Sequence, residues 1–277
     1  EAWVERIPQL LRGRIEVDDL RFHSRDWTGS NAPSKFQQIK LMGDNPAARK
    51  LLRDHVKRFT PDAILFHNVI PIGSFGLFFE AKKLGVPSLQ YIHNFRPFSP
   101  GGTLWTGKMA TDSALHGNPW PEIISGAWQG SRLKTAILAW HLYQARKKGL
   151  LDCIDHWIAI SEFMFKQFIR AGIPKSKISV LRHCWNTPHS LSRTDEGLHY
   201  LYLGRLSHEK GLYSLVAAWK HLASVLGDRC PKLVLAGDGP MEELLRETAK
   251  DTPQVPFVGF VEGDRKSTLI KQARALM

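Results

Sequence analysis

The stretch from His199 to Gly211, which reads His-Tyr-Leu-Tyr-Leu-Gly-Arg-Leu-Ser-His-Glu-Lys-Gly, carries the clearest fold signal in the chain. Its apolar run ends at Gly204, as buried parallel strands do before a loop. Arg205 offers a planar fork of donors to phosphate oxygens, and Lys210 adds a compact charge. A helix is expected to follow, and its amino terminus would add free N–H groups and a positive dipole. The pattern predicts a diphosphate-binding loop; the alternative is a surface loop whose cations are merely solvated.

Length and composition place the chain among globular proteins. Its 277 residues suffice for two domains, which typically have roughly 100 to 200 residues each. Hydrophobic residues make up 43% and charged residues 23%, enough for substantial cores. The three cysteines are widely spaced, so neither a disulfide framework nor a zinc site is indicated, and a cytoplasmic location is expected. The most apolar stretch, residues 63–81, is interrupted by polar residues, proline and glycine and should not span a bilayer.

The net charge of +12 predicts attraction to an anionic partner. Nucleic acid, acidic lipid and a phosphorylated substrate all qualify. The sequence contains no zinc finger, helix-turn-helix spacing or aromatic-basic ribonucleoprotein signature, so nucleic acid is not expected. A small phosphorylated ligand together with a membrane surface explains the charge better.

The first part of the chain alternates between strand and helix patterns, which is typical of a parallel sheet covered by helices. We predict strands over residues 14–24, 63–66, 87–92, 156–160 and 178–181, and helices over 46–59, 72–84, 131–149 and 162–171. His67-Asn68 and His93-Asn94 directly follow two of the strands, where ligands of such sheets bind. Residues 95–121 are rich in proline and glycine and are predicted to form a long loop near these strand ends.

A polar run over residues 182–198 is interpreted as a linker, with the domain boundary near residue 190. The second domain, residues 191–277, repeats the alternation. Strands are predicted over 200–203, 232–236 and 256–258, and helices over 212–226, 241–250 and from about 264 onward. Three strands are too few for a finished sheet, and the chain stops at Met277 inside a helical pattern and begins with Glu1. We therefore expect a fragment that lacks both ends and has an incomplete second domain.

Several short motifs share their order with a known family. In the first domain they are Pro61-Asp-Ala-Ile-Leu-Phe-His-Asn68, Gly85-Val-Pro87, Tyr91-Ile-His-Asn-Phe-Arg96, Ser161-Glu-Phe163, Ala171-Gly-Ile-Pro174 and Lys177-Ile-Ser-Val180. In the second they are Gly204-Arg205, Lys210-Gly211, Leu233-Val-Leu-Ala-Gly-Asp-Gly-Pro240 and Val258-Gly-Phe-Val261. With this ordered set the chain resembles the retaining, nucleotide-sugar-dependent glycosyltransferases of family 4. The resemblance implies the α/β GT-B fold, in which two Rossmann-like α/β/α domains face a cleft: an acceptor-side domain, residues 1–190, and a partial donor domain, residues 191–277.

The resemblance also implies the reaction, which is transfer of a sugar from a nucleoside diphosphate sugar to an acceptor hydroxyl with retention at the anomeric carbon. It implies no metal and no cofactor. Arg205 and Lys210 would neutralise the leaving diphosphate, a contribution concentrated in the transition state. The same donor site would include Gly204, Gly237 and Gly239, and the backbone of Phe260 and Val261 would flank the base. A plain strand-to-helix turn is the alternative for residues 237–240, since Pro240 suits a first helical position.

On the acceptor side, the resemblance places His93 near the transferred sugar and the acceptor, where a neutral imidazole can donate or accept a hydrogen bond. Asn94 and Arg96 would line the same pocket. The alternative for His93 is a structural histidine that is satisfied by a nearby carbonyl. The expected acceptor is a glycan, a lipid-linked glycan or a small molecule, in polysaccharide or glycoconjugate biosynthesis.

Two departures from the family pattern stand out. Leu181 is followed by Arg-His-Cys-Trp-Asn instead of an Asn-Gly turn. The paired glutamates of the family, eight positions apart, would lie beyond Met277, so this chain alone is not expected to be a competent catalyst. Two other functions stay open: a nucleotide-sugar epimerase of the same fold, and a non-catalytic binding module.

Peripheral attachment to an anionic membrane is expected from residues 132–151, where aromatic, aliphatic and basic residues mix as in interfacial helices. The residues concerned are Leu133, Lys134, Ile137, Leu138, Trp140, Leu142, Tyr143, Arg146, Lys147 and Lys148. The alternative is a helix packed on the sheet with a solvated end.

Overall fold

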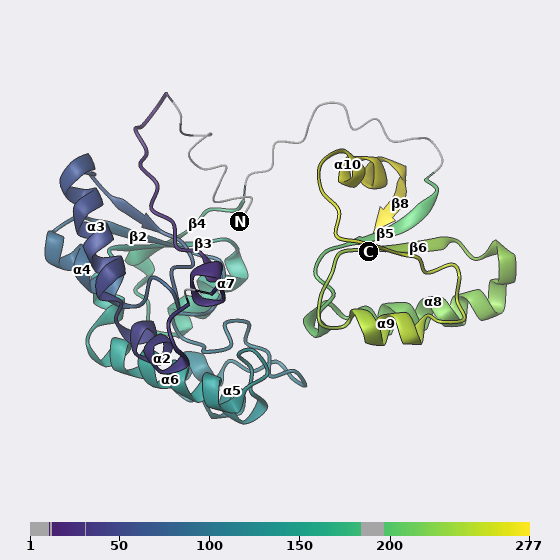
Figure 1. The fold of residues 1–277 in the computed structure, drawn as a ribbon, viewed down its shortest axis with the longest axis horizontal. Coiled ribbons are helices and arrows are strands. Elements are labelled where there is room, and N and C mark those ends of the chain that lie inside the picture. Colours follow the sequence, from purple (N-terminus) through teal and green to yellow (C-terminus); the bar gives the residue numbers. More distant parts are fainter. Residues whose placement is uncertain (1–10, 12, 31, 184–196) are drawn as a thin grey trace. The chain divides into compact units, whose positions relative to one another are not determined.

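The computed structural model describes residues 11, 13–30, 32–183 and 197–277, and it divides the chain into two compact units (Figure 1). Unit 1 comprises residues 1–184 and unit 2 residues 185–277. The predicted boundary near residue 190, and most of the predicted linker, lie outside the described residues.

Unit 1 is built on a parallel sheet with the order β1-β2-β3-β4. Its strands are β1 (Ile64–Phe66), β2 (Ser88–Ile92), β3 (His156–Ala159) and β4 (Ile178–Val180). These are the four strands that the sequence predicts after residue 60. The helices of unit 1 are α2 (Lys35–Gly43), α3 (Pro46–Phe59), α4 (Gly76–Leu84), α5 (Trp120–Ser125), α6 (Arg132–Lys147) and α7 (Glu162–Arg170). Short 3₁₀ helices add η1 (Ser24–Trp27), η2 (Ser113–His116), η3 (Leu150–Cys153) and η4 (Lys175–Lys177).

Local sequence explains where the long helices of unit 1 begin. The side chains of Asn45, Ser131 and Ser161 each accept a hydrogen bond from a backbone N–H in the first turn of the following helix. Inside, Trp157 of β3 lies beside Phe168 of α7, and both are fully buried. The sheet and its helices thus share one apolar core.

The predicted strand over residues 14–24 is wrong. These residues form turns and irregular structure that leads into η1, and most of them are exposed. Asp18 pairs with Arg58 of α3 at 2.8 Å, so charged side chains hold this segment on the surface. No strand among the described residues pairs with it, and an isolated strand leaves its backbone hydrogen-bonding groups without ladder partners.

Unit 2 also contains a parallel sheet, with the order β7-β6-β5-β8. Its strands are β5 (His199–Leu203), β6 (Lys232–Ala236), β7 (Phe257–Gly259) and β8 (Ala273–Leu276). Its helices are α8 (Leu212–Leu226), α9 (Glu242–Thr248) and α10 (Gly263–Gln272), with 3₁₀ helices η5 (His208–Lys210) and η6 (Gly227–Arg229).

The predicted helix that continues to the end of the chain is wrong. Helix α10 ends at Gln272, and the next four residues form β8, the fourth strand of the sheet. Ala273 is buried and pairs with His199 of β5. The hydrogen bonds offered by the free edge of β5 outweigh the helical preference of this Ala- and Leu-containing segment, because tertiary pairing routinely overrides intrinsic propensity.

In unit 2, two loops pass each other with no room for side chains. The backbone of Gly204 donates to Ala236 O, and that of Leu206 donates to Asp238 O. A Cβ added to Gly237 would lie 1.9 Å from Gly204 O, and one added to Gly239 would lie 2.4 Å from Leu206 O. Both glycines also have positive φ angles, 142° and 154°, which L side chains rarely adopt. This close approach gives the Gly-Asp-Gly turn a structural role.

In unit 1, the long loop after β2 is organised by one buried carboxylate. Glu122 of α5 has no exposed surface; it accepts hydrogen bonds from the Ser99 hydroxyl and from the Gly101 N–H at 2.7 Å. Ser99 Oγ in turn accepts from the Gly102 N–H. Burial raises the pKa of Glu122. The two hydrogen bonds and the nearby Arg96 act in the opposite direction, but the pKa stays above its ordinary value. The predicted loop is therefore anchored and largely buried between residues 95 and 104.

We predict that Gly237→Ala destabilises the protein by about 3 kcal/mol, because the new methyl group meets a carbonyl oxygen and the backbone conformation is unfavourable. Thermal unfolding followed by circular dichroism measures this. Gly227→Ala is the matched control: Gly227 also has a positive φ, 55°, but no atom lies within 4 Å of its would-be Cβ. Equal losses in the two variants would show that the close approach is unimportant.

We also predict opposite behaviour for two substitutions of Glu122. Glu122→Leu should lose roughly 3 kcal/mol because it leaves buried donors unsatisfied, whereas Glu122→Gln can still accept from Gly101 and donate to Ser99.

Because the folded pKa of Glu122 is raised, the folded state binds the proton more tightly. The free energy of unfolding of the wild type should therefore fall as the pH rises from 4.5 through the folded pKa.

Urea unfolding over this pH range tests the second expectation. Glu122→Gln should lack the component of the pH slope that Glu122 contributes. An identical slope in the wild type and Glu122→Gln would contradict the raised pKa.

Candidate functional site

Two His-Asn pairs meet at the carboxyl edge of the sheet in unit 1. His67 and Asn68 follow β1, and His93 and Asn94 follow β2. His67 Nδ1 lies 2.8 Å from His93 Nε2, and Asn94 Nδ2 donates to Asn68 Oδ1 at 3.1 Å. Since β1 and β2 run parallel, their polar successors must emerge side by side.

The two histidines belong to a cluster of four rings. Tyr91 stacks on His67, and His183, which follows β4, stacks on both Tyr91 and His93 with ring centroids 5.6 Å apart. The Tyr91 hydroxyl donates to the carbonyl oxygen of Leu181 at 2.9 Å, which ties β2 to the end of β4. We did not predict His183 or Tyr91 as site residues. The available signal was that His183, like the other two histidines, follows a predicted strand.

Burial keeps the paired imidazoles neutral. It lowers the pKa of His67 and of His93 from 6.5 to about 4, and repulsion between the two rings adds to the effect on His93. Burial also lowers the pKa of His183. At neutral pH one ring of the His67–His93 pair donates and the other accepts, which leaves each ring one more nitrogen for another partner. Among the described residues, no group of three or more His, Cys, Asp or Glu side chains is arranged to hold a metal ion.

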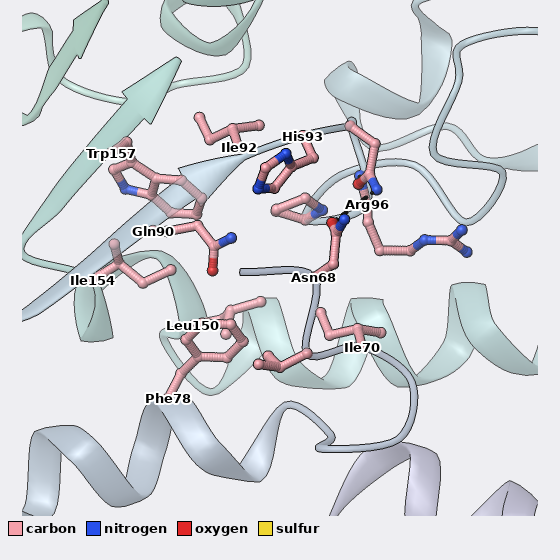
Figure 2. A pocket seen from close by; sticks show the side chains of 13 residues that line it. Asn68, Ile70, Phe78, Gln90, Ile92, His93, Arg96, Leu150, Ile154 and Trp157 are labelled. Carbon is pink, nitrogen blue, oxygen red and sulfur yellow. Dashed lines mark hydrogen bonds between the residues drawn. The ribbon is translucent and has the colours of Figure 1, made fainter. Parts of the chain in front are cut away.

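A small cavity of about 20 Å³ opens beside His93 (Figure 2). Its polar side is formed by Asn68, His93, Asn94 and Arg96, and its apolar side includes Phe78 and Ile92. Two buried polar groups also line it: Gln90 Oε1 and Trp157 Nε1 have no hydrogen-bond partner in the described part of the chain. The cavity has room for about one water molecule, and the two residues that carry these unpartnered atoms contribute to its lining.

Arg96 stabilises the loop as well as lining the cavity. Its Nη1 donates to Pro100 O at 2.7 Å, its backbone N–H donates to Asn94 Oδ1 at 2.9 Å, and its guanidinium lies 5.9 Å from the Trp128 ring. Burial lowers its pKa, whereas the buried Glu122 raises it. At least one donor of Arg96 is therefore used to hold the loop. The three predicted acceptor-side residues, His93, Asn94 and Arg96, line the same cavity.

In unit 2, Arg205 and Lys210 lie on the loop between β5 and α8. Both are exposed, and neither forms an ion pair with another residue that the structure describes. Glu209 lies on the same loop, and its carboxylate accepts a hydrogen bond from the Ser207 hydroxyl at 2.6 Å. Burial raises the pKa of Glu209, but the Ser207 hydrogen bond and the two neighbouring cations lower it overall.

Helix α8 begins directly after this loop. Its N-cap residue is Gly211, which has no side chain to accept a hydrogen bond from the first turn. The 15-residue helix therefore starts with free N–H groups next to two exposed cations. This arrangement suits an anion.

The other predicted donor-side residues fall into two groups. Gly204, Gly237 and Gly239 form the close backbone contact described above, and Gly237 N–H also donates to Gly259 O at 2.8 Å. Phe260 is exposed, with 66% of its surface accessible, whereas the Val261 side chain is buried in the core beside β5 and β6. The Val261 side chain is therefore not available to a ligand.

Family models match both units. The model described as Glycosyltransferase Family 4 matches residues 32–187, and the model described as Glycosyl transferases group 1 matches residues 197–277. An uncharacterized glycosyltransferase of Methanocaldococcus jannaschii is 33% identical over 91 residues, which cover 32% of this chain and 23% of that protein. The 2-deoxystreptamine N-acetyl-D-glucosaminyltransferase of Niallia circulans is 42% identical over 80 residues, which cover 28% of this chain and 20% of that protein. The chain thus matches a quarter or less of either relative.

A solved structure extends the likeness to the fold. HepE from Anabaena, crystallised in complex with UDP, has a TM-score of 0.52 at 14% identity over 83% of this chain and 56% of that one. The same protein in complex with UDP-glucose has a TM-score of 0.51. This likeness and the two parallel sheets confirm the predicted α/β fold of the GT-B type. Since the first family model covers more than half of the 277 residues, the chain belongs to glycosyltransferase family 4.

Proposed function

We propose that the whole protein transfers a sugar from a nucleoside diphosphate sugar to an acceptor hydroxyl, with retention of the anomeric configuration. Family membership supports glycosyl transfer in general. One observation supports a nucleoside diphosphate sugar as the donor. Two exposed cations, Arg205 and Lys210, lie on the loop that leads into the uncapped start of α8. Two positive charges and a helix amino terminus match a diphosphate.

On this proposal, the loop between β5 and α8, which we call the donor loop, acts mainly in the transition state. As the bond between the anomeric carbon and the diphosphate breaks, the leaving group gains negative charge. Arg205 and Lys210 then interact more strongly than they do with the intact donor, and this difference lowers the barrier. The close backbone contact with Gly237 and Gly239 fixes the path of the loop at Gly204 and Leu206, on either side of Arg205.

The neutral His93 would act on the other reactant. With one nitrogen bonded to His67, the remaining nitrogen can hydrogen-bond a sugar or acceptor hydroxyl. Asn94 and Asn68 stand beside it with amide groups suited to hydroxyls. This polar edge favours a hydroxyl-bearing acceptor.

UDP is the first nucleotide to test. HepE was crystallised with UDP and with UDP-glucose, and the Niallia circulans relative is named as an N-acetyl-D-glucosaminyltransferase. Titration calorimetry with UDP, GDP and ADP compares the three bases directly. The anomeric configuration of the product, read by NMR, tests retention. Release of a free epimerised sugar without any acceptor would instead identify an epimerase, and binding without turnover would identify a non-catalytic module.

We predict that Arg205→Ala and Lys210→Ala each weaken UDP binding by roughly tenfold and lower the turnover of the whole protein by about 100-fold. Calorimetry and steady-state kinetics measure the two effects. Lys232→Ala is the matched control, because Lys232 is an exposed cation at the amino end of β6, the opposite end of a strand in the same sheet. Unchanged binding and kinetics in both loop variants would refute the diphosphate site.

We predict that His67 positions His93 through their hydrogen bond. His67→Phe removes the bond and should lower kcat/KM about tenfold, whereas His67→Gln, which can still donate, should retain more activity. Loss of the charge that His67 can carry should also raise the pKa of His93 above about 4, but only in part, because burial is the larger cause of the lowered pKa and remains. The acid limb of the pH profile should therefore move to higher pH in His67→Phe.

Circular dichroism and thermal unfolding show whether His67→Phe folds normally. If the variant loses activity uniformly across the pH range and His67→Gln behaves identically, then His67 does not position His93 and serves only in packing.

A further inference from the structure

Helix α6 carries an apolar face toward solvent as well as toward the core. Its inward side chains, such as Leu138 and Leu142, are buried. Its outward side chains include Leu133, Trp140 and Tyr143, which expose 71%, 59% and 58% of their surface. A surface helix of a globular protein normally presents polar residues to water. The exposed apolar face therefore indicates a surface that something else covers.

The neighbouring helix α5 also exposes large apolar side chains. It lies beside the start of α6 (Figure 1), and a Cβ added to Gly126 would lie 3.1 Å from the backbone of Gly130 and Ser131. Trp120 and Ile124 of α5 are exposed to 65% and 62%. We define the α5–α6 surface by these two residues together with Leu133, Trp140 and Tyr143. The Trp140 and Tyr143 rings are in contact, with centroids 6.2 Å apart.

The charge on this part of the chain has one sign. Between residues 120 and 148 the only acidic residue is Glu122, which has no exposed surface. The same segment contains five cationic residues. Arg132, Lys134, Lys147 and Lys148 are exposed, whereas Arg146 is half-buried with its guanidinium 5.1 Å from the buried Phe98 ring. None of the five forms an ion pair with a residue that the structure describes. Any surface that covers α5 and α6 must therefore tolerate apolar groups and supply negative charge.

We propose that the α5–α6 surface binds the interface of an anionic lipid bilayer. Tryptophan and tyrosine place an apolar ring and a polar tip at the headgroup level, and lysine and arginine attract acidic headgroups. No helix in the described part of the chain is long and apolar enough to cross a membrane. The inference does not depend on the proposed sugar transfer, because binding to lipid requires neither a donor nor an acceptor.

The test is cosedimentation of the protein with vesicles of phosphatidylcholine alone and of phosphatidylcholine with increasing phosphatidylglycerol. We expect binding that rises with phosphatidylglycerol and falls with salt. The apolar variant Leu133→Ser/Trp140→Ser and the charge variant Lys147→Glu/Lys148→Glu should each weaken binding by at least about tenfold.

Matched controls on α8 and β6 separate this surface from the general positive charge of the protein. Tyr213→Ser/Val225→Ser removes comparable exposed apolar groups, and Lys220→Glu/Lys232→Glu reverses two exposed charges elsewhere. Both control variants should bind almost as well as the wild type, with circular dichroism confirming that all four fold.

Three results would overturn the proposal. One is equal binding to neutral and anionic vesicles, and another is equal weakening by the surface and control variants. The third is a dimer in light scattering that only the apolar variant dissociates, together with no vesicle binding. That result would assign the α5–α6 surface to a second copy of the chain.

Discussion

Parallel pairing of short strands controls where the polar residues of this chain can lie. All strands of each sheet end at the same edge, and their backbone groups are satisfied by neighbouring strands. The candidate site residues therefore lie on the loops that follow the strands. His67, His93 and His183 follow three strands of unit 1, and Arg205 follows a strand of unit 2. In both units the sheet supplies a rigid edge, and short loops supply the side chains.

The two edges use different electrostatics. In unit 1 the imidazoles are partly buried, and burial removes their charge at neutral pH. They are hydrogen-bonding groups of fixed orientation, held by Tyr91 and by a loop anchored on Glu122. In unit 2 the cations stay exposed and charged, and only the backbone beneath them is buried. Neutral imidazoles at one edge and exposed cations at the other are what the proposed transfer from a nucleoside diphosphate sugar to a hydroxyl would require.

Close packing of backbone explains why glycine is required in the turn after β6, which lies against the start of the loop between β5 and α8. Gly237 and Gly239 leave no space for a Cβ against Gly204 O and Leu206 O, and both adopt positive φ. The sequence motif is therefore explained by contact between two loops, whatever ligand lies above them. Helix α6 also has two different faces. Core residues lie on one side, and exposed aromatic and basic residues lie on the other.

The sequence alone was sufficient for the alternation of strands and helices, the GT-B resemblance and the placement of candidate residues after strand ends. These features depend on local periodicity, helix caps and glycine positions, which neighbouring residues encode. Tertiary structure decided what depends on distant partners. Residues 14–24 pair with no strand that the structure describes, whereas Ala273–Leu276 pairs with the edge of β5 and forms a strand. The stacking of His183 on His93 and the anchoring of the loop by Glu122 join residues 90 and about 20 positions apart. Such contacts depend on three-dimensional proximity and on burial, which no local pattern contains.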